Sequence, residues 1–305
     1  MILPLRTKYL FYGLLAMIIL LPWRGLAQVS SFALSPSKLE IKLAPGESVI
    51  RNLYVKNLTS ADADFSINVE DVSGSNDTEA IVTYYGSGLG PYSIKNYVVV
   101  DTDHINVAAG ETKAVPIMIS LPTTARPGGL YGGVFISPVK SAQKSGPNIS
   151  PRLGLLVFLR VKGKVEEQGQ VQRFDAGAGQ KIFWTNGPID FQVAFKNTGN
   201  VHLNPYGQIE LKNWSGQVVD RLLLEPWYVF PDALRTRLMT WTKPPLFGYF
   251  TATLILNHGY TVPSGTTMSY NFFIIPLPLL AGLLVLLVLI FVVYKVISRA
   301  KKWQI

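Results

Sequence analysis

The chain has no cysteine, and this absence removes several chemistries at once. None of its 305 residues is a cysteine, so disulfide bonds, thiolate metal sites and a cysteine nucleophile are all excluded. A chain of this composition has to be held together by its apolar core.

Sequence motifs for catalysis are also missing. The chain contains no nucleophile elbow, zinc motif, nucleotide fingerprint, His-x-x-x-His pair or Asp-x-Asp-x-Asp-Gly loop. The three histidines, His104, His202 and His258, lie apart in strand-and-turn regions. We therefore predict no catalytic residue, no metal ligand and no cofactor. Carboxylate pairs are placed by the fold rather than by spacing, so a surface hydrolase remains an alternative.

Acidic residues are scarce at the two ends of the chain, and this explains the high formal charge of +9. Three basic residues lie in residues 1–27 and four lie in 295–305, whereas all 19 acidic residues lie between. The segment between the ends then carries 21 basic against 19 acidic residues, a formal charge of +2. This distribution argues against nucleic acid as a partner.

The ends indicate an exported protein with a membrane anchor. Residues 1–27 have a basic start, an apolar stretch and small residues before Gln28, which is typical of a signal peptide. Ile274 to Tyr294 carries no charge and is long enough, as a helix, to cross a bilayer. Four basic residues follow it within 295–305, so we predict a cytoplasmic tail there. The expected localisation is a single-pass cell-membrane protein whose N-terminal part is extracytoplasmic.

Between the ends, apolar residues recur with a period of two, as in Leu39, Ile41 and Leu43 or Phe191, Val193 and Phe195. Gly, Pro, Asn and Asp separate these runs, a pattern typical of half-buried antiparallel strands. We predict an all-β chain with two tandem immunoglobulin-like sandwiches, 28–164 and 165–271, before the transmembrane helix. Arg152 to Lys162 is expected to be a buried strand that pairs with Tyr131 to Ser137.

A weak internal repeat supports two similar sandwiches. Leu53 to Asn57 and Val193 to Asn197 have the same form, a strand that delivers Lys-Asn to a turn. In the second copy the turn is Asn197-Thr-Gly-Asn200, followed by His202. His202 alternates with the apolar Val201 and Leu203, and no orienting acid or ligand partner is spaced for it. We predict a structural or solvent-exposed role for this histidine.

Aromatic residues supply the remaining site candidates. Thr83 to Tyr92 combines three tyrosines with glycines, so Tyr84, Tyr85 and Tyr92 are candidate ligand-binding residues. A long exposed loop with a partly buried aromatic would have the same composition. Trp214, Trp227 and Trp241 fall in strand-like positions of the second sandwich, where core packing or contact at a membrane interface is expected.

Several motifs in Phe32 to Gly163 resemble one known family. They are Phe32-x-x-Ser-Pro36, Leu43-Ala-Pro-Gly46-Glu47, Val107-x-Ala-Gly110-x-Thr112 and Gly132-Gly-Val-Phe135. The chain resembles the WxL-interacting proteins, which are bacterial surface proteins with two immunoglobulin-like sandwiches, a C-terminal span and a basic tail. The resemblance implies a peptidoglycan-binding first domain and a second domain that contacts host or partner proteins.

The function predicted from the sequence is therefore non-enzymatic binding at the cell surface. The expected partner is cell-wall glycan or another surface protein, with the plasma membrane contacted through Ile274 to Tyr294. The alternative is a membrane-tethered assembly chaperone for exported proteins, in which an exposed strand edge accepts a strand of the partner.

Overall fold

The computed structural model describes residues 31–75, 82–139, 151–184, 187–259 and 264–302. Within these residues the chain forms eighteen strands, a short 3₁₀ turn (η1, Lys95–Tyr97) and one α-helix, so the all-β prediction is confirmed. The predicted signal peptide, 1–27, lies outside the described residues.

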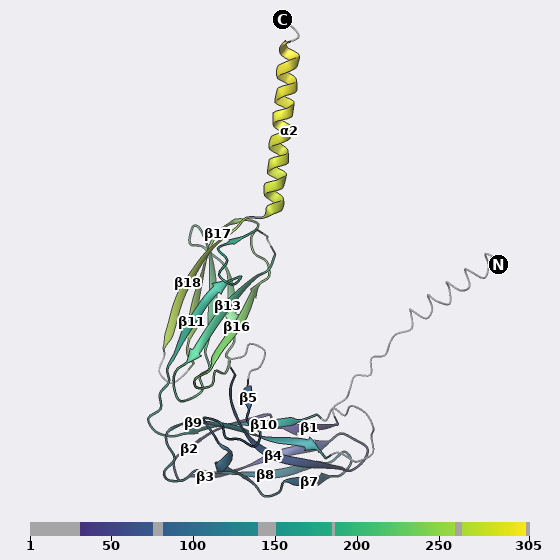
Figure 1. The fold of residues 1–305 in the computed structure, drawn as a ribbon, viewed down its shortest axis with the longest axis vertical. Helices are drawn as coiled ribbons and strands as arrows, with labels where there is room; N and C mark the ends of the chain where they lie inside the picture. Colours follow the sequence, from purple (N-terminus) through teal and green to yellow (C-terminus); the bar gives the residue numbers. More distant parts are fainter. Residues whose placement is uncertain (1–30, 76–81, 140–150, 185–186, 260–263, 303–305) are drawn as a thin grey trace, which may run out of the picture.

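The first ten strands form two facing sheets, the first sandwich (Figure 1). One sheet has the order β1-β3-β8-β6, and the other has the order β2-β10-β9-β4-β5, with β7 also pairing with β4. The strands are β1 (Phe32–Ser35), β2 (Lys38–Leu43), β3 (Ser48–Asn57), β4 (Ala63–Gly74), β5 (Val82–Tyr84), β6 (Val98–Val100), β7 (His104–Val107), β8 (Thr112–Ser120), β9 (Gly128–Pro138) and β10 (Leu153–Val161).

The period-two pattern places alternate side chains between these sheets. In β8, Val115, Ile117 and Ile119 are buried while their neighbours are exposed. The predicted pairing of the last strand is confirmed, because β10 runs antiparallel to β9 with Leu153 opposite Ile136. Burial of these alternate apolar residues is the main source of stability in a chain without disulfides.

The remaining eight strands form the second sandwich. Its sheets have the orders β11-β13-β16 and β12-β18-β17-β14-β15. The strands are β11 (Gly169–Ala176), β12 (Ile182–Phe183), β13 (Ile189–Asn197), β14 (Tyr206–Asn213), β15 (Val218–Leu224), β16 (Leu234–Trp241), β17 (Gly248–Asn257) and β18 (Gly265–Ile274). The sheets divide between β10 and β11, whereas the exact boundaries 28–164 and 165–271 stay a prediction.

The helix corrects one prediction from the sequence. Strand β18 extends to Ile274, where it pairs with β12 and β17, and α2 (Leu277–Lys302) starts only after it. The apolar part of α2 therefore starts at Leu277 and not at Ile274. Among the described residues no helix is long and apolar enough to cross a membrane, so the predicted span and single-pass localisation are contradicted.

The internal repeat corresponds to two equivalent buried turns. Asn57 ends β3 and Asn197 ends β13, and neither side chain is exposed. Asn57 Nδ2 donates to the carbonyls of Ala61 (2.8 Å) and Val107 (3.0 Å). Asn197 Nδ2 donates to the carbonyls of Val201 (2.7 Å) and Val229 (2.9 Å). Each asparagine thus connects its own turn to a second segment through buried backbone carbonyls.

Candidate binding site at the junction of the two sandwiches

The edge of β10 is only partly covered. The chain leaves the sheet of β3 after Ser35 and joins β10 at Lys38, so β2 pairs with Leu156–Val161 and not with the residues before them. Leu153–Leu155 consequently have β9 on one side and no described strand on the other. A strand edge of this kind presents unpaired backbone donors and acceptors.

The hydrogen bond next to this open edge shows which donors face outward. The amide of Leu156 donates to the carbonyl of Ser37 at 2.9 Å, on the side away from β9. Because successive amides of a strand alternate in direction, the amides of Gly154 and Arg152 point to the same side. Both are thus directed at the open edge.

Beside this edge, an aromatic ring covers two glycines. Added Cβ atoms on Gly133 and Gly154 would lie 2.8 Å and 2.4 Å from the ring of Phe135, so no larger residue fits under it. The guanidinium of Arg152 stacks on this ring at 4.1 Å and also pairs with Glu70. Tyr84 meets the same ring edge-on, with centroids 5.5 Å apart.

A cleft of about 370 Å³ lies further along β10, where the two sandwiches meet. Its walls carry side chains of both sandwiches, among them Lys42, Phe158, Arg160, His202 and Tyr228. Arg160 also pairs with Glu167, in the connection between β10 and β11. The cleft is mixed in character, because the carboxylate of Glu40 and the side chain of Asn204 line it together with these cationic and aromatic groups.

His202 is the buried polar group of this junction. Its backbone amide donates to the hydroxyl of Tyr131 at 2.6 Å, and that hydroxyl lies 3.2 Å from its Nδ1. The ring is packed edge-on against Phe158, with centroids 5.1 Å apart. Solvent exposure of this residue is wrong, because Tyr131 and Phe158 of the first sandwich cover the ring, and a structural role stays a prediction.

Burial lowers the pKa of His202 from its ordinary 6.5 to about 4. Glu40 opposes this shift, while Lys38, Lys42 and Arg160 add to it. The ring is therefore neutral near neutral pH, and its Nδ1 can accept a hydrogen bond from the Tyr131 hydroxyl.

The candidate tyrosines do not form one site. Tyr84 is exposed and packs on Phe135, whereas the Tyr85 hydroxyl lies 3.1 Å from Ser73 Oγ. The hydroxyl of Tyr92 donates to Asp232 of the second sandwich at 2.7 Å, and burial together with this hydrogen bond raises the pKa of Tyr92. Tyr92 connects the two sandwiches, and Tyr84 remains the tyrosine most open to a ligand.

The loop that carries these tyrosines is attached to a residue that sequence patterns did not single out. Asp71 is fully buried in β4, and its carboxylate accepts the amides of Gly90, Ile94 and Lys95, each at 3.0 Å. The loop is therefore fixed to the sheet rather than free to adapt. No motif marks an aspartate for this role, because its partners lie about twenty residues away.

Backbone and side chains lock the sandwiches together elsewhere along the junction. The amide of Gly129 donates to the carbonyl of Asn200 at 2.8 Å. A Cβ on Gly199 would lie 2.2 Å from the carbonyl oxygen of Glu166, so the turn after Asn197 packs directly on the connecting segment. Phe158 and Tyr131 of the first sandwich belong to the same apolar cluster as the core of the second.

Gly74, at the end of β4, offers a test of this packing. A Cβ there would lie 2.5 Å from Cβ of Ala233 and 2.9 Å from Cβ of Phe230. We expect Gly74→Ala to lower the free energy of unfolding by about 1–3 kcal/mol through overpacking. Denaturant unfolding measures this, and adding Ala233→Gly should restore part of the loss as a non-additive coupling. Additive effects of the two substitutions would contradict direct packing of the sandwiches at this point.

Comparison with known proteins returns solved structures only. No family model and no curated protein matches the chain. The chaperone–tip adhesin complex of CFA/I fimbriae matches with a TM-score of 0.44 and 14% identity, covering 79% of this chain and 98% of that chain. The class 5 fimbriae chaperone CfaA matches with a TM-score of 0.43 and 15% identity, covering 78% and 98%. The SafB chaperone with the SafA pilin of Salmonella enterica matches with a TM-score of 0.39 and 13% identity, covering 79% and 98%. These are distant likenesses of fold.

The resemblance to WxL-interacting proteins is therefore wrong. No family model supports it. The motif at Pro45 to Glu47 has a local explanation, because Glu47 accepts the amide of Ala44 at 2.6 Å and Gly46 has a φ of 83°. Such a turn between β2 and β3 serves any sandwich and identifies no family.

Proposed function

We propose that the protein is a non-enzymatic assembly chaperone for exported protein subunits, built from two immunoglobulin-like sandwiches. An extended strand of the partner pairs with the open edge of β10 at Leu153–Leu155. The observation that carries the proposal is this edge, which β2 leaves uncovered beside the cleft between the sandwiches. Pairing with an added strand is a common mode of peptide recognition.

Backbone groups supply the affinity in this mode. The amides of Arg152 and Gly154 face the edge, so they donate to carbonyls of the added strand. Residues on the two faces of β10 then meet alternate side chains of the partner, and Leu155 and Val157 point into the core of the first sandwich. A partner strand with alternating apolar residues fits this edge.

The cleft supplies a second contact. Lys42 and Phe158 line it beside the carboxylate of Glu40 and the ion pair of Arg160 with Glu167, so it accepts a segment with both polar and apolar side chains. The bonds of Tyr92 and Tyr131 to the second sandwich hold the cleft and the open edge in a constant relation. Binding of a partner therefore requires little further loss of conformational entropy in the site.

The reading as a binder of cell-wall glycan or of another surface protein has less support. Tyr84 stays exposed, but Tyr85 and Tyr92 are engaged within the protein. Among the described residues, no three His, Cys, Asp or Glu side chains gather where they could hold a metal ion. Binding of cell-wall glycan would give the open edge of β10 no function.

Arg152→Pro tests the proposal, with Arg152→Ala as the matched control. Both variants lose the contacts to Phe135 and Glu70, but only the proline removes the amide that faces the edge. In cells that make the partner subunits, we expect tagged Arg152→Ala protein to co-purify with them. Arg152→Pro should retain less than a tenth as much, measured by quantitative mass spectrometry. Equal retention by the two variants would rule out pairing at this edge.

A further inference from the structure

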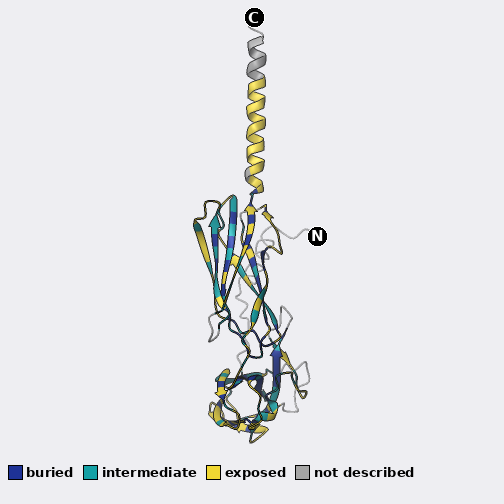
Figure 2. Ribbon diagram, turned by 90° about the vertical axis from the view of Figure 1, so that its left-hand side faces the viewer, coloured by how far each residue is buried: buried dark blue, intermediate teal, exposed yellow. Residues whose placement is uncertain are grey.

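The sheet β1-β3-β8-β6 turns one face away from the rest of the described chain. The second sandwich packs on the other sheet, through Tyr131 of β9 and Phe158 of β10. Figure 1 shows β3 and β8 on the side of the first sandwich that is remote from the second, and Figure 2 shows exposed residues along this side. The outer face of this sheet is therefore open to a partner, and the β10 edge lies in the other sheet.

Large apolar side chains lie next to one another on this face. Ile50 of β3 pairs with Met118 of β8, and Met118 pairs with Val99 of β6, so the three side chains form a row across neighbouring strands. Ile50 is 61% exposed, Tyr54 46%, Val99 45% and Met118 39%. We call these four residues the outer patch. Adjacent exposed apolar residues of this kind mark an interaction surface.

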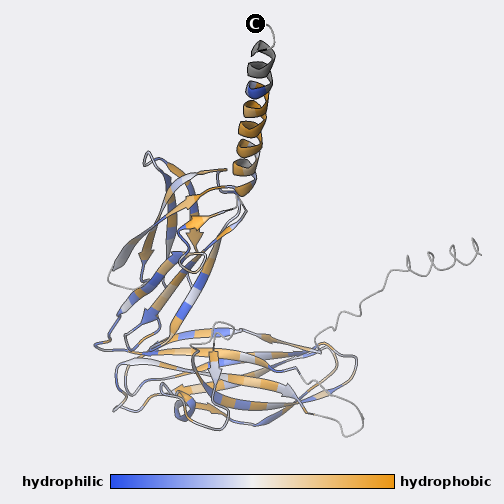
Figure 3. Ribbon diagram, turned by 45° about the horizontal axis from the view of Figure 1, so that its top comes forward, coloured by the Kyte–Doolittle hydropathy of each residue, from blue (hydrophilic) through white to orange (hydrophobic). Residues whose placement is uncertain are grey.

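Strand β8, in the middle of this face, is apolar on both of its sides. None of residues 114–119 has a polar side chain, although every second one points outward, and Figure 3 shows the hydropathy of these strands. In an antiparallel sheet with one face in water, apolar and polar residues usually alternate. A continuous apolar run is typical of a strand that is covered on both faces.

The outer face carries very little charge. Of the outward residues of these four described strands, Lys56 alone is charged, and it lies near the end of β3. Arg51 and Lys113 alternate with the outward residues, so they belong to the other side of the sheet. There, Lys113 Nζ donates to the carbonyl of Asn106 at 3.1 Å. A partner on this face consequently buries few charges.

The order of the strands makes this face complementary to itself. Strand β8 lies between β3 and β6, so a two-fold axis along β8 places β3 of one copy opposite β6 of the other. Met118 then meets the partner's Met118, and Ile50 meets the partner's Val99, because these residues lie in one row. Each exposed side chain of the row is thereby covered by an apolar side chain.

The same axis brings opposite charges together. Beside β8, β6 runs in the same direction as β3, so the connection after β6 extends toward the level of Lys56. This connection carries two exposed carboxylates, Asp101 and Asp103. Lys56 of one copy therefore faces carboxylates of the other rather than a second lysine, and this charge complementarity favours a second copy as the occupant.

We propose that two copies of the chain form a symmetric dimer through the outer patch, with their β1-β3-β8-β6 sheets packed face to face. The β10 edge stays uncovered in both copies, so the dimer carries two such edges. Because the apolar contact is confined to three strands, we expect a dissociation constant in the micromolar range. The dimer does not depend on the chaperone function.

A cysteine at the axis tests the arrangement, because the chain has no other cysteine. Met118→Cys places two thiols opposite each other, so a mild oxidant such as copper phenanthroline should join most of the full-length chains into a disulfide-linked dimer. Ile255→Cys, at a similarly exposed position of the second sandwich, is the matched control and should give less than a tenth as much. Equal cross-linking of the two variants, or none at Met118, would overturn the proposal.

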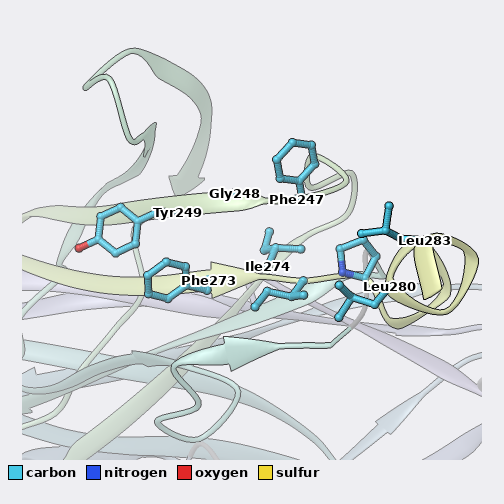
Figure 4. Close-up of a pocket in the computed structure, with 9 residues that line it drawn as sticks. Phe247, Gly248, Tyr249, Phe273, Ile274, Leu280 and Leu283 are labelled. Atoms are coloured by element: carbon cyan, nitrogen blue, oxygen red, sulfur yellow. The ribbon is translucent and has the colours of Figure 1, made fainter. Parts of the chain in front are cut away.

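A second experiment separates the outer patch from α2. A cavity of about 480 Å³ between β17, β18 and α2 is lined by apolar side chains such as Leu280 and Leu283 (Figure 4), so it is a competing apolar surface. In sedimentation equilibrium of the full chain, Ile50→Ser with Met118→Ser should raise the dissociation constant at least tenfold. Leu280→Ser with Leu283→Ser should leave it unchanged. The reverse result would place the contact at α2 and sink the proposal.

Exchange of charges is a third readout, and it leaves the apolar side chains in place. Lys56→Glu should weaken the dimer several-fold, since the new carboxylate faces Asp101 and Asp103 of the partner subunit. Adding Asp101→Lys and Asp103→Lys should restore the association, because the two signs are then exchanged. If the triple variant dissociates further instead, these charges do not face each other and the axis along β8 is wrong.

Discussion

Replacing Asn197 by alanine is expected to lower the free energy of unfolding by about 3–5 kcal/mol. The side chain has no exposed surface, and its Nδ2 satisfies the carbonyls of Val201 and Val229 while its Oδ1 accepts the amide of Gly199 at 2.9 Å. Alanine leaves the carbonyl of Val201 without this donor, at a cost of about 1–3 kcal/mol. It also removes one hydrogen bond from the carbonyl of Val229, which still accepts the amide of Leu203, and one from the amide of Gly199, which still donates to Gln168, at about 0.5–1.5 kcal/mol each. Equilibrium unfolding in urea measures the loss.

Asn213→Ala is the matched control for this prediction. Asn213 also accepts hydrogen bonds in a turn, from the amides of Ser215 (3.1 Å) and Gln217 (3.0 Å). That turn is open to solvent, so water replaces the lost partner and the expected cost is within about 1 kcal/mol. Equal losses in the two variants would show that burial is not what makes Asn197 important.

Acidification is expected to destabilise the protein through His202. The pKa of His202 is lowered to about 4 in the folded protein, against 6.5 for the solvent-exposed ring in an unfolded chain. Between these two values the unfolded state binds more protons, so the stabilisation is complete above pH 6.5 and is lost as the pH falls to 4. The shift corresponds to about 3 kcal/mol over this window.

The measurement is the free energy of unfolding as a function of pH for the unmodified protein and for His202→Gln. We expect the two curves to differ in slope between pH 6.5 and 4, because only the first contains the titrating ring. Burial also lowers the pKa of His258, which further reduces the free energy of unfolding on acidification. This contribution is the same in both proteins. Parallel curves for the unmodified protein and His202→Gln would contradict a neutral, buried His202.

Local pattern was enough for much of the fold. Alternation of apolar and polar residues predicted the strands. In a sheet with one buried face, every second side chain of a strand points to the core, whichever strands lie beside it. The pairing of β10 with β9 followed from two apolar runs joined by a polar segment. The repeated Lys-Asn before a turn identified the equivalent positions Asn57 and Asn197. Local sequence was enough here because each side chain donates to the carbonyl four residues further along the chain.

The candidate site could not be predicted in the same way, because its residues come together only through contacts distant in sequence. Tyr92 belongs to a composition typical of a binding loop, yet its hydroxyl bonds to Asp232, 140 positions away. The open edge at Leu153–Leu155 exists because β2 begins opposite Leu156, and nothing within β10 itself specifies where its neighbour starts.

The sequence by itself determined that the protein is all-β, lacks disulfides and has apolar, uncharged residues near its C-terminus, because composition and short-range periodicity suffice for these. Only the tertiary structure decided the burial of His202, the uncovered edge of β10 and the point where α2 begins. Each of the three depends on which distant segment occupies a neighbouring position. His202 alternates like an outward-facing residue in its own segment and is buried because Phe158 packs on it. Likewise, Ile274 is as apolar as the helix after it, but its pairing with Gly248 and Phe183 makes it part of a sheet.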